Sequence, residues 1–167
     1  VFDTQEGYRT YAELTIEDRV ESTLGYYHPL YDQLLLFEDP NLGAGGDTLR
    51  VLYHEGFHQF IHPLIPHIPY WVNEGLAEYF GASEVKDGKV VRTGLVQGGR
   101  LSGLQAWLNR GGRAFPFDQI MLESPGEFYS GDVPLKYAQA WAMVHFFMQA
   151  GAAKYRPVLQ SYVDALR

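Results

Sequence analysis

The chain has 167 residues, of which 46% are hydrophobic and 20% charged, a balance typical of a single globular domain. It contains no cysteine, which excludes disulfides, thiolate metal ligands and cysteine nucleophiles, so a transition-metal site has to use His, Asp or Glu. The formal net charge is −7, and because the 13 basic residues form no stripe along the sequence, we expect no nucleic-acid partner.

We expect neither a signal peptide within residues 1–10 nor a membrane span in this sequence. Residues 1–10 are polar and lack the apolar core of a signal peptide. No run of 18 apolar residues occurs anywhere, so we expect no membrane span. We expect residues 1–167 to form one domain, either complete in itself or excised from a longer protein, since the chain begins with Val1 rather than Met.

The first half of the chain is predicted to contain a strand and two helices. Residues 25–37 are aromatic and aliphatic and precede a Glu-Asp-Pro-Asn turn, which predicts a strand with room for a partner upstream. Residues 43–46, Gly-Ala-Gly-Gly, predict a loop. Asp47 then stands where a helix cap belongs, and apolar residues at helical spacing predict a helix over residues 48–62. An aromatic-rich second helix is expected over residues 70–82.

The second half is predicted to be mostly helical after one hairpin. An Asp-Gly pair at the centre of residues 85–93 predicts a hairpin of two short strands. Pro157 is expected in the first turn of the last helix. The remaining elements are helices over residues 101–109, 134–150 and 152–166, with a loop and one short helix over residues 115–131. Together these patterns predict an α+β fold, mostly helical, with a small antiparallel or mixed sheet near its N-terminus.

Residues 54–58 read His-Glu-Gly-Phe-His. On a helix, His54 and His58 lie one turn apart on one face, so both imidazoles can bind a single metal ion. Glu55 can direct its carboxylate at a water molecule that the metal activates, take the proton and later deliver it to a leaving amine. By itself the pattern is equally compatible with an amphipathic helix that carries surface histidines and a solvated glutamate, so the interpretation depends on a third ligand.

Glu74 is the candidate third ligand. Fifteen residues separate it from His58, and three prolines among them predict a turn that lets the second helix fold back on the first. Glu78, one turn further along, can accept a hydrogen bond from the free ring nitrogen of a ligand histidine, for which His54 is the candidate. The alternative is a solvated helix face, which is disfavoured because the helix is otherwise apolar and unpaired carboxylates there would be costly.

Residues 54–58 and 73–78 (Asn-Glu-Gly-Leu-Ala-Glu) resemble the corresponding segments of the gluzincin zinc metallopeptidases, which include thermolysin-like and aminopeptidase N-like enzymes. They are most similar to the short bacterial peptidase MA-like domains. The resemblance implies a zincin-like fold, a Zn²⁺ cofactor and a peptide or protein substrate. It also implies that Glu74 is the third ligand, that Glu78 supports a histidine, and that Asn73 lies in the shell around the ligands.

Residues 135–144 are similar to the aminopeptidase N-like helix that starts with a catalytic tyrosine. The matching residue is Tyr137, 63 positions after Glu74, and the resemblance implies that its hydroxyl binds the oxyanion of the tetrahedral intermediate. The alternative is a core or surface tyrosine, because the chain has 12 of them. No Gly-x-Met-Glu-Asn segment is present, with which the aminopeptidase N-like enzymes bind the free amine of a substrate, so exopeptidase activity is disfavoured. The resemblance favours a secreted or periplasmic protein of a bacterium over a cytoplasmic one.

The hypothesis that follows is a zinc-dependent peptidase in which His54, His58 and Glu74 hold the metal, Glu55 acts as general base and Tyr137 stabilises the oxyanion. One alternative is a catalytically weak or inactive metal-binding module that binds peptides or partner proteins, and an intact Glu55 disfavours it. The other is a purely structural metal domain or an immunity-like partner protein. Three ligands with an open position disfavour that reading, because structural zinc sites are usually closed by four.

Overall fold

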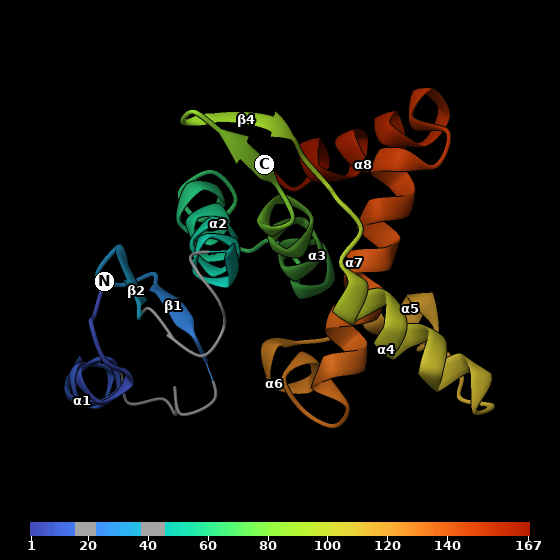
Figure 1. Cartoon of the computed structure of the whole chain (residues 1–167). Helices are drawn as coiled ribbons and strands as arrows, with labels where there is room; N and C mark the ends of the chain where they lie inside the picture. The colour runs from blue at the N-terminus through green and yellow to red at the C-terminus, as the bar shows by residue number, and fades with distance from the viewer. Residues whose placement is uncertain (16–22, 38–45) are drawn as a thin grey trace.

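Helices make up most of the computed structural model, which describes residues 1–15, 23–37 and 46–167 (Figure 1). The helices and strands in the described residues are α1 (Gln5–Thr15), β1 (Gly25–His28), β2 (Gln33–Leu36), α2 (Gly46–Ile61), α3 (Tyr70–Gly81), β3 (Glu84–Lys86), β4 (Lys89–Arg92), α4 (Gly98–Asn109), α5 (Phe117–Ile120), α6 (Pro125–Phe128), α7 (Val133–Gln149) and α8 (Ala152–Ala165). The strands form two separate antiparallel pairs. This is the predicted α+β fold, with the mostly helical character expected from the sequence.

The segment predicted as one strand over residues 25–37 forms a hairpin instead. β1 and β2 pair antiparallel, with Gly25 opposite Leu36 and His28 opposite Gln33. The chain reverses between them at Asp32, which has a φ of 49°, a left-handed conformation that Asp tolerates better than most residues. The aromatic and aliphatic run therefore supplies both strands of the N-terminal sheet.

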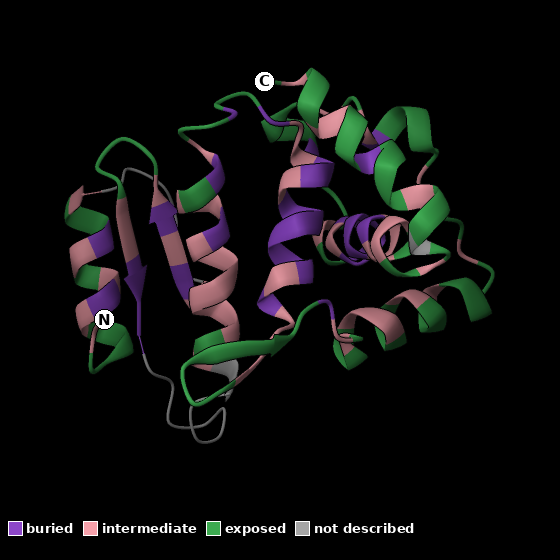
Figure 2. Cartoon of the chain, turned by 90° about the horizontal axis from the view of Figure 1, so that it is seen from above, coloured by how far each residue is buried: buried purple, intermediate pink, exposed green. Residues whose placement is uncertain are grey.

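Helix α1 was not predicted, because its sequence is largely polar. It packs on the N-terminal sheet through Tyr8 and Ala12, which are fully buried in a small cluster with Leu35 and Phe37. Figures 1 and 2 both show the sheet between α1 and α2. One face of β1 and β2 is thereby placed against the helix that carries the two candidate histidine ligands.

Helix α2 begins at Gly46, so Asp47 lies inside its first turn rather than before it as a cap. The first three residues of the predicted glycine-rich loop, 43–45, lie outside the described residues. α3 packs between α2 and α7, and the largest buried cluster joins these three helices to α8 (Figure 2). Most of α3 is buried, as its aromatic-rich sequence predicts.

Two glycines allow α3 to approach its neighbours closely. A Cβ atom added to Gly75 would lie 2.6 Å from the carbonyl oxygen of Ala140 on α7, closer than real side chains are found. A Cβ atom added to Gly81 would lie 3.2 Å from the carbonyl oxygen of Arg50 on α2. The lack of a side chain at these two positions therefore sets the spacing of α3 from α7 on one side and from α2 on the other.

The remaining predicted elements differ only in detail. The hairpin of β3 and β4 turns at Asp87 and Gly88, which have φ values of 50° and 72°, as its Asp-Gly signal requires. Two short helices, α5 and α6, form where one was expected. Pro157 is the sixth residue of α8, beyond the first turn. Within residues 1–15, 23–37 and 46–167, no helix combines the length and hydropathy needed to cross a membrane.

Candidate metal centre

The two histidines of α2 and the first glutamate of α3 meet at one point. The Nε2 atoms of His54 and His58 lie 3.2 Å apart. The Oε2 atom of Glu74 lies 3.3 Å from Nε2 of His54 and 3.6 Å from Nε2 of His58. One ligand atom from each residue lies within 4.8 Å of the others, and no other group of three such residues is found in the described part of the chain. These three side chains can hold a metal ion.

The Glu74 carboxylate has one satisfied and one unsatisfied oxygen. Glu74 is 2% exposed, and its Oε2 atom is buried without a hydrogen-bond partner. A buried carboxylate oxygen left in this state is costly unless a cation satisfies it. Because Oε2 faces two imidazole nitrogens, a cation among the three atoms would satisfy it. Two imidazoles and a carboxylate are a donor set that suits zinc and leaves a coordination position open.

Without a metal, Glu74 and His58 stabilise each other as ions. Burial by itself would raise the pKa of Glu74, but the neighbouring His58 and His54 outweigh burial and hold that pKa well below its usual range. Burial would likewise lower the pKa of His58, yet the negative charge of Glu74 raises it to about 9. A metal ion that binds here therefore displaces a proton, as is usual at histidine sites.

Polar partners hold the rings so that both Nε2 atoms face Glu74. Asn73 lies with its Oδ1 atom 3.1 Å from Nδ1 of His58. Glu78 lies with Oε1 at 3.6 Å from Nδ1 of His54, an ion-pair rather than a hydrogen-bond distance. Both residues thus occupy the positions from which outer partners orient imidazole ligands.

Arg100 on α4 fixes Glu78 in turn. Its Nε donates to Oε2 of Glu78 at 3.2 Å and its Nη2 donates to Oε1 at 2.6 Å, a bidentate pair. Burial would raise the pKa of Glu78, but the paired guanidinium outweighs burial and lowers it. The sequence offered no reason to link Arg100 with α3, since 22 residues separate it from Glu78.

Glu55 is held from the side of the N-terminal sheet. Its Oε2 atom accepts a hydrogen bond of 3.0 Å from the backbone N–H of Tyr27 on β1. The pKa of Glu55 is raised, first by burial, although His54 and His58 act in the opposite direction. The strand can come this close because Gly25 has no side chain: an added Cβ would lie 2.5 Å from Cγ1 of Val51. Sequence reasoning missed this support, because the donor is a backbone group.

Tyr137, on α7, lies beside the ligands with its ring stacked near that of His54, the ring centroids being 6.4 Å apart. The pKa of Tyr137 is raised above the ordinary tyrosine value by burial and then by the charges of Glu74 and Glu55. Its hydroxyl is therefore protonated at neutral pH and able to donate a hydrogen bond.

Tyr129 is a site residue that the sequence did not reveal. It follows α6, and its hydroxyl donates a hydrogen bond of 2.6 Å to Oε1 of Glu74. This bond occupies one carboxylate oxygen and leaves Oε2 directed at His54 and His58. Because Tyr129 belongs to a segment predicted as mostly loop, 55 residues after Glu74, no local pattern marks it.

Replacing Tyr129 by phenylalanine should weaken zinc binding about tenfold, the lower end of the effect seen when an outer partner of a metal ligand is removed. The phenyl ring keeps the packing but leaves Glu74 free to rotate. Competition with a chromogenic zinc chelator measures the affinity. Tyr155→Phe, on α8, is the matched control and should bind zinc as the unaltered protein does. Equal affinity in both variants would show that Glu74 needs no such support.

Comparison with known proteins gives one match. No curated protein and no solved structure matches this chain. The family described as "Protein of unknown function (DUF1570)" matches residues 48–163, which run from the first turns of α2 into α8. The matched region contains every side chain described above at the candidate metal centre, and it covers well over half of the chain. The chain therefore belongs to the DUF1570 family.

Proposed function

We propose that this protein is a zinc-dependent peptidase whose metal is held by His54, His58 and Glu74. The observation that carries the proposal is the buried Oε2 atom of Glu74, which has no hydrogen-bond partner and faces the Nε2 atoms of two histidines. A bound zinc ion would supply Lewis-acid chemistry, polarising a peptide carbonyl and lowering the pKa of water.

The proton transfers fall to Glu55. It neighbours a ligand in sequence, it is buried, and its raised pKa suits a group that accepts and then returns a proton near neutral pH. The N–H of Tyr27 fixes Oε2, so that Oε1 is the oxygen that takes the proton from the attacking water and passes it to the leaving nitrogen. An isolated metal-binding module would have no use for a carboxylate held in this way.

Tyr137 is the residue that stabilises the negative charge developing on the substrate. A protonated phenol beside the ligands can donate a hydrogen bond to the carbonyl oxygen as it becomes an oxyanion, and such a donor acts most strongly in a partly desolvated site. The proposed substrate is a peptide or protein, because general base and oxyanion donor flank the same centre and together serve amide hydrolysis.

The proposal is tested by metal content and by cleavage of a peptide library before and after chelation. We expect about one zinc ion per chain, since the three ligands form a single site. Cleavage should stop when a chelator removes the zinc and return when zinc is added, but not when magnesium or calcium is added, because these ions prefer oxygen ligands. Cleavage that survives chelation would contradict the proposal, and zinc binding without cleavage of any peptide would favour a metal-binding module.

A further inference from the structure

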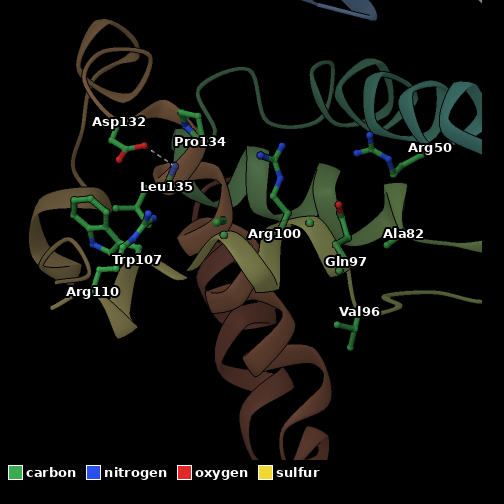
Figure 3. Close-up of a pocket in the computed structure, with 14 residues that line it drawn as sticks. Arg50, Ala82, Val96, Gln97, Arg100, Trp107, Arg110, Asp132, Pro134 and Leu135 are labelled. Carbon is green, nitrogen blue, oxygen red and sulfur yellow. Dashed lines mark hydrogen bonds between the residues drawn. The ribbon is translucent and has the colours of Figure 1, made fainter. Parts of the chain in front are cut away.

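An open pocket of about 760 Å³ is lined in part by Arg100, the residue that pairs with Glu78 beside the metal centre. It lies between α2, α4 and the start of α7, and Figure 3 shows the side chains that line it. Arg50 comes from α2, while Arg100 and Arg110 come from the first turn and the end of α4. Trp107 and Leu135 add apolar surface. A pocket of this size accepts one or two amino-acid side chains.

Arginines gather at this pocket although the chain is acidic. Three arginines line it, against a net charge of −7 for the whole sequence. Asp132 is the only acidic residue among the lining residues, and its carboxylate accepts a hydrogen bond of 3.1 Å from the N–H of Leu135 (Figure 3). The charge of Arg100 is offset by its ion pair with Glu78, which does not itself line the pocket. Among the lining residues, arginines outnumber carboxylates by three to one.

Two of the guanidinium groups, those of Arg100 and Arg110, keep donors for a ligand. Arg100 uses Nε and Nη2 on Glu78, and within the described residues its Nη1 has no hydrogen-bond acceptor. Arg110 is exposed and donates through Nε to the carbonyl oxygen of Ala106. Its two Nη atoms have no acceptor among the described residues and are available to a ligand. Planar guanidinium groups bind carboxylates through paired hydrogen bonds, so the ligand that matches these two arginines is a carboxylate.

The pocket is separated from the metal ligands by only one or two side chains. The guanidinium carbon of Arg100 lies 5.0 Å from the centre of the Tyr137 ring. The same guanidinium pairs with Glu78, whose Oε1 atom lies 3.6 Å from Nδ1 of His54. A peptide with a side chain in the pocket would thus extend past Tyr137 to the metal centre.

We propose that this pocket binds an acidic side chain of the substrate, so that the peptidase selects peptides with Asp or Glu close to the cleaved bond. The inference rests on the proposed function, because it names the substrate class of that same site. Trp107 and Leu135 would contact the aliphatic part of the bound residue and its neighbour. A nucleic acid fits less well, because a phosphate backbone needs a broader basic face.

The test is direct binding of labelled peptides to the zinc-loaded Glu55→Gln chain, in which slow turnover keeps the peptide intact. One peptide carries two adjacent glutamates, and its partner carries glutamines there. Fluorescence anisotropy should show the glutamate peptide binding about tenfold more tightly, with a preference that declines as salt is added. Arg110→Gln should reduce the preference about threefold, the effect of losing one exposed charge pair.

Arg113→Gln is the matched control, because Arg113 is exposed close to Arg110 but does not line the pocket. It should keep the full preference. Arg100 is left unchanged, since its loss would also release Glu78. Equal binding of both peptides, equal losses in the two variants, or tighter binding of a single-stranded oligonucleotide would each overturn the proposal.

The two proposals fail in different ways. Metal-dependent cleavage of library peptides without any acidic preference would overturn the pocket assignment and leave the peptidase standing. An acidic preference that depends on Arg110, in a protein that cleaves nothing, would support the pocket as a binding site and overturn the peptidase.

Discussion

Replacing Glu55 by glutamine should lower peptide hydrolysis by about 10²- to 10⁴-fold, the range for loss of a general acid–base group, and leave bound zinc unchanged. Glutamine has the shape of glutamate. Its amide oxygen can still accept the hydrogen bond from the N–H of Tyr27, which in the unaltered protein lies 3.0 Å from Oε2 of Glu55. The ligand atoms of His54, His58 and Glu74 are untouched. The variant therefore loses the proton acceptor alone.

The measurement pairs initial rates on the best library peptide with the zinc content of the same samples. Glu84→Gln is the control, because Glu84 lies on the hairpin of β3 and β4 and pairs with Arg92 rather than with any metal ligand. It should hydrolyse at the rate of the unaltered protein. Full activity in Glu55→Gln would assign the proton transfer to another group, and loss of zinc would mean that Glu55 helps to hold the metal.

Glu74→Ala should weaken zinc binding by more than the roughly 10- to 100-fold that loss of an outer partner costs, because a ligand itself is removed. Only His54 and His58 would remain, and the hydroxyl of Tyr129 would lose its acceptor. Zinc should raise the unfolding temperature of the unaltered protein, since a ligand that binds only the folded state stabilises it. The same addition should leave the melting of Glu74→Ala nearly unchanged.

Competition with a chelator and thermal unfolding with and without zinc give the two readouts. Glu84→Ala serves as the control for loss of a glutamate from the surface and should retain the zinc-dependent rise. A Glu74→Ala protein that binds zinc as tightly as the unaltered chain would show that Glu74 is not a ligand and that zinc binds elsewhere.

The sequence predicted those parts of the fold and site that depend on local spacing. His54 and His58 meet because four residues make about one helical turn. The hairpin at Asp87 and Gly88 follows from a turn that needs positive φ at both positions. Glu74 reached the histidines as expected because prolines end α2 and let α3 run back beside it.

The parts that escaped prediction depend on contacts between distant segments. Tyr129 reaches Glu74 from the residue after a short helix with no periodic pattern, and Tyr27 supports Glu55 through a backbone N–H that any residue except proline would supply. The polar sequence of α1 hides the two residues that bury it, Tyr8 and Ala12. Basic residues that form no stripe in the sequence gather at one pocket only after α2 and α4 are brought together.

The close packing of α3 bears on how related sequences should be read. Glu74 is followed directly by Gly75, against α7, and α3 ends at Gly81, against α2. One added carbon at Gly75 would push α3 away from the helix that carries Tyr137, and one at Gly81 would require a small shift of the helix that carries the histidines. A relative could therefore keep every ligand residue and still have lost the centre, so the two glycines belong beside the ligands in any sequence signature for it.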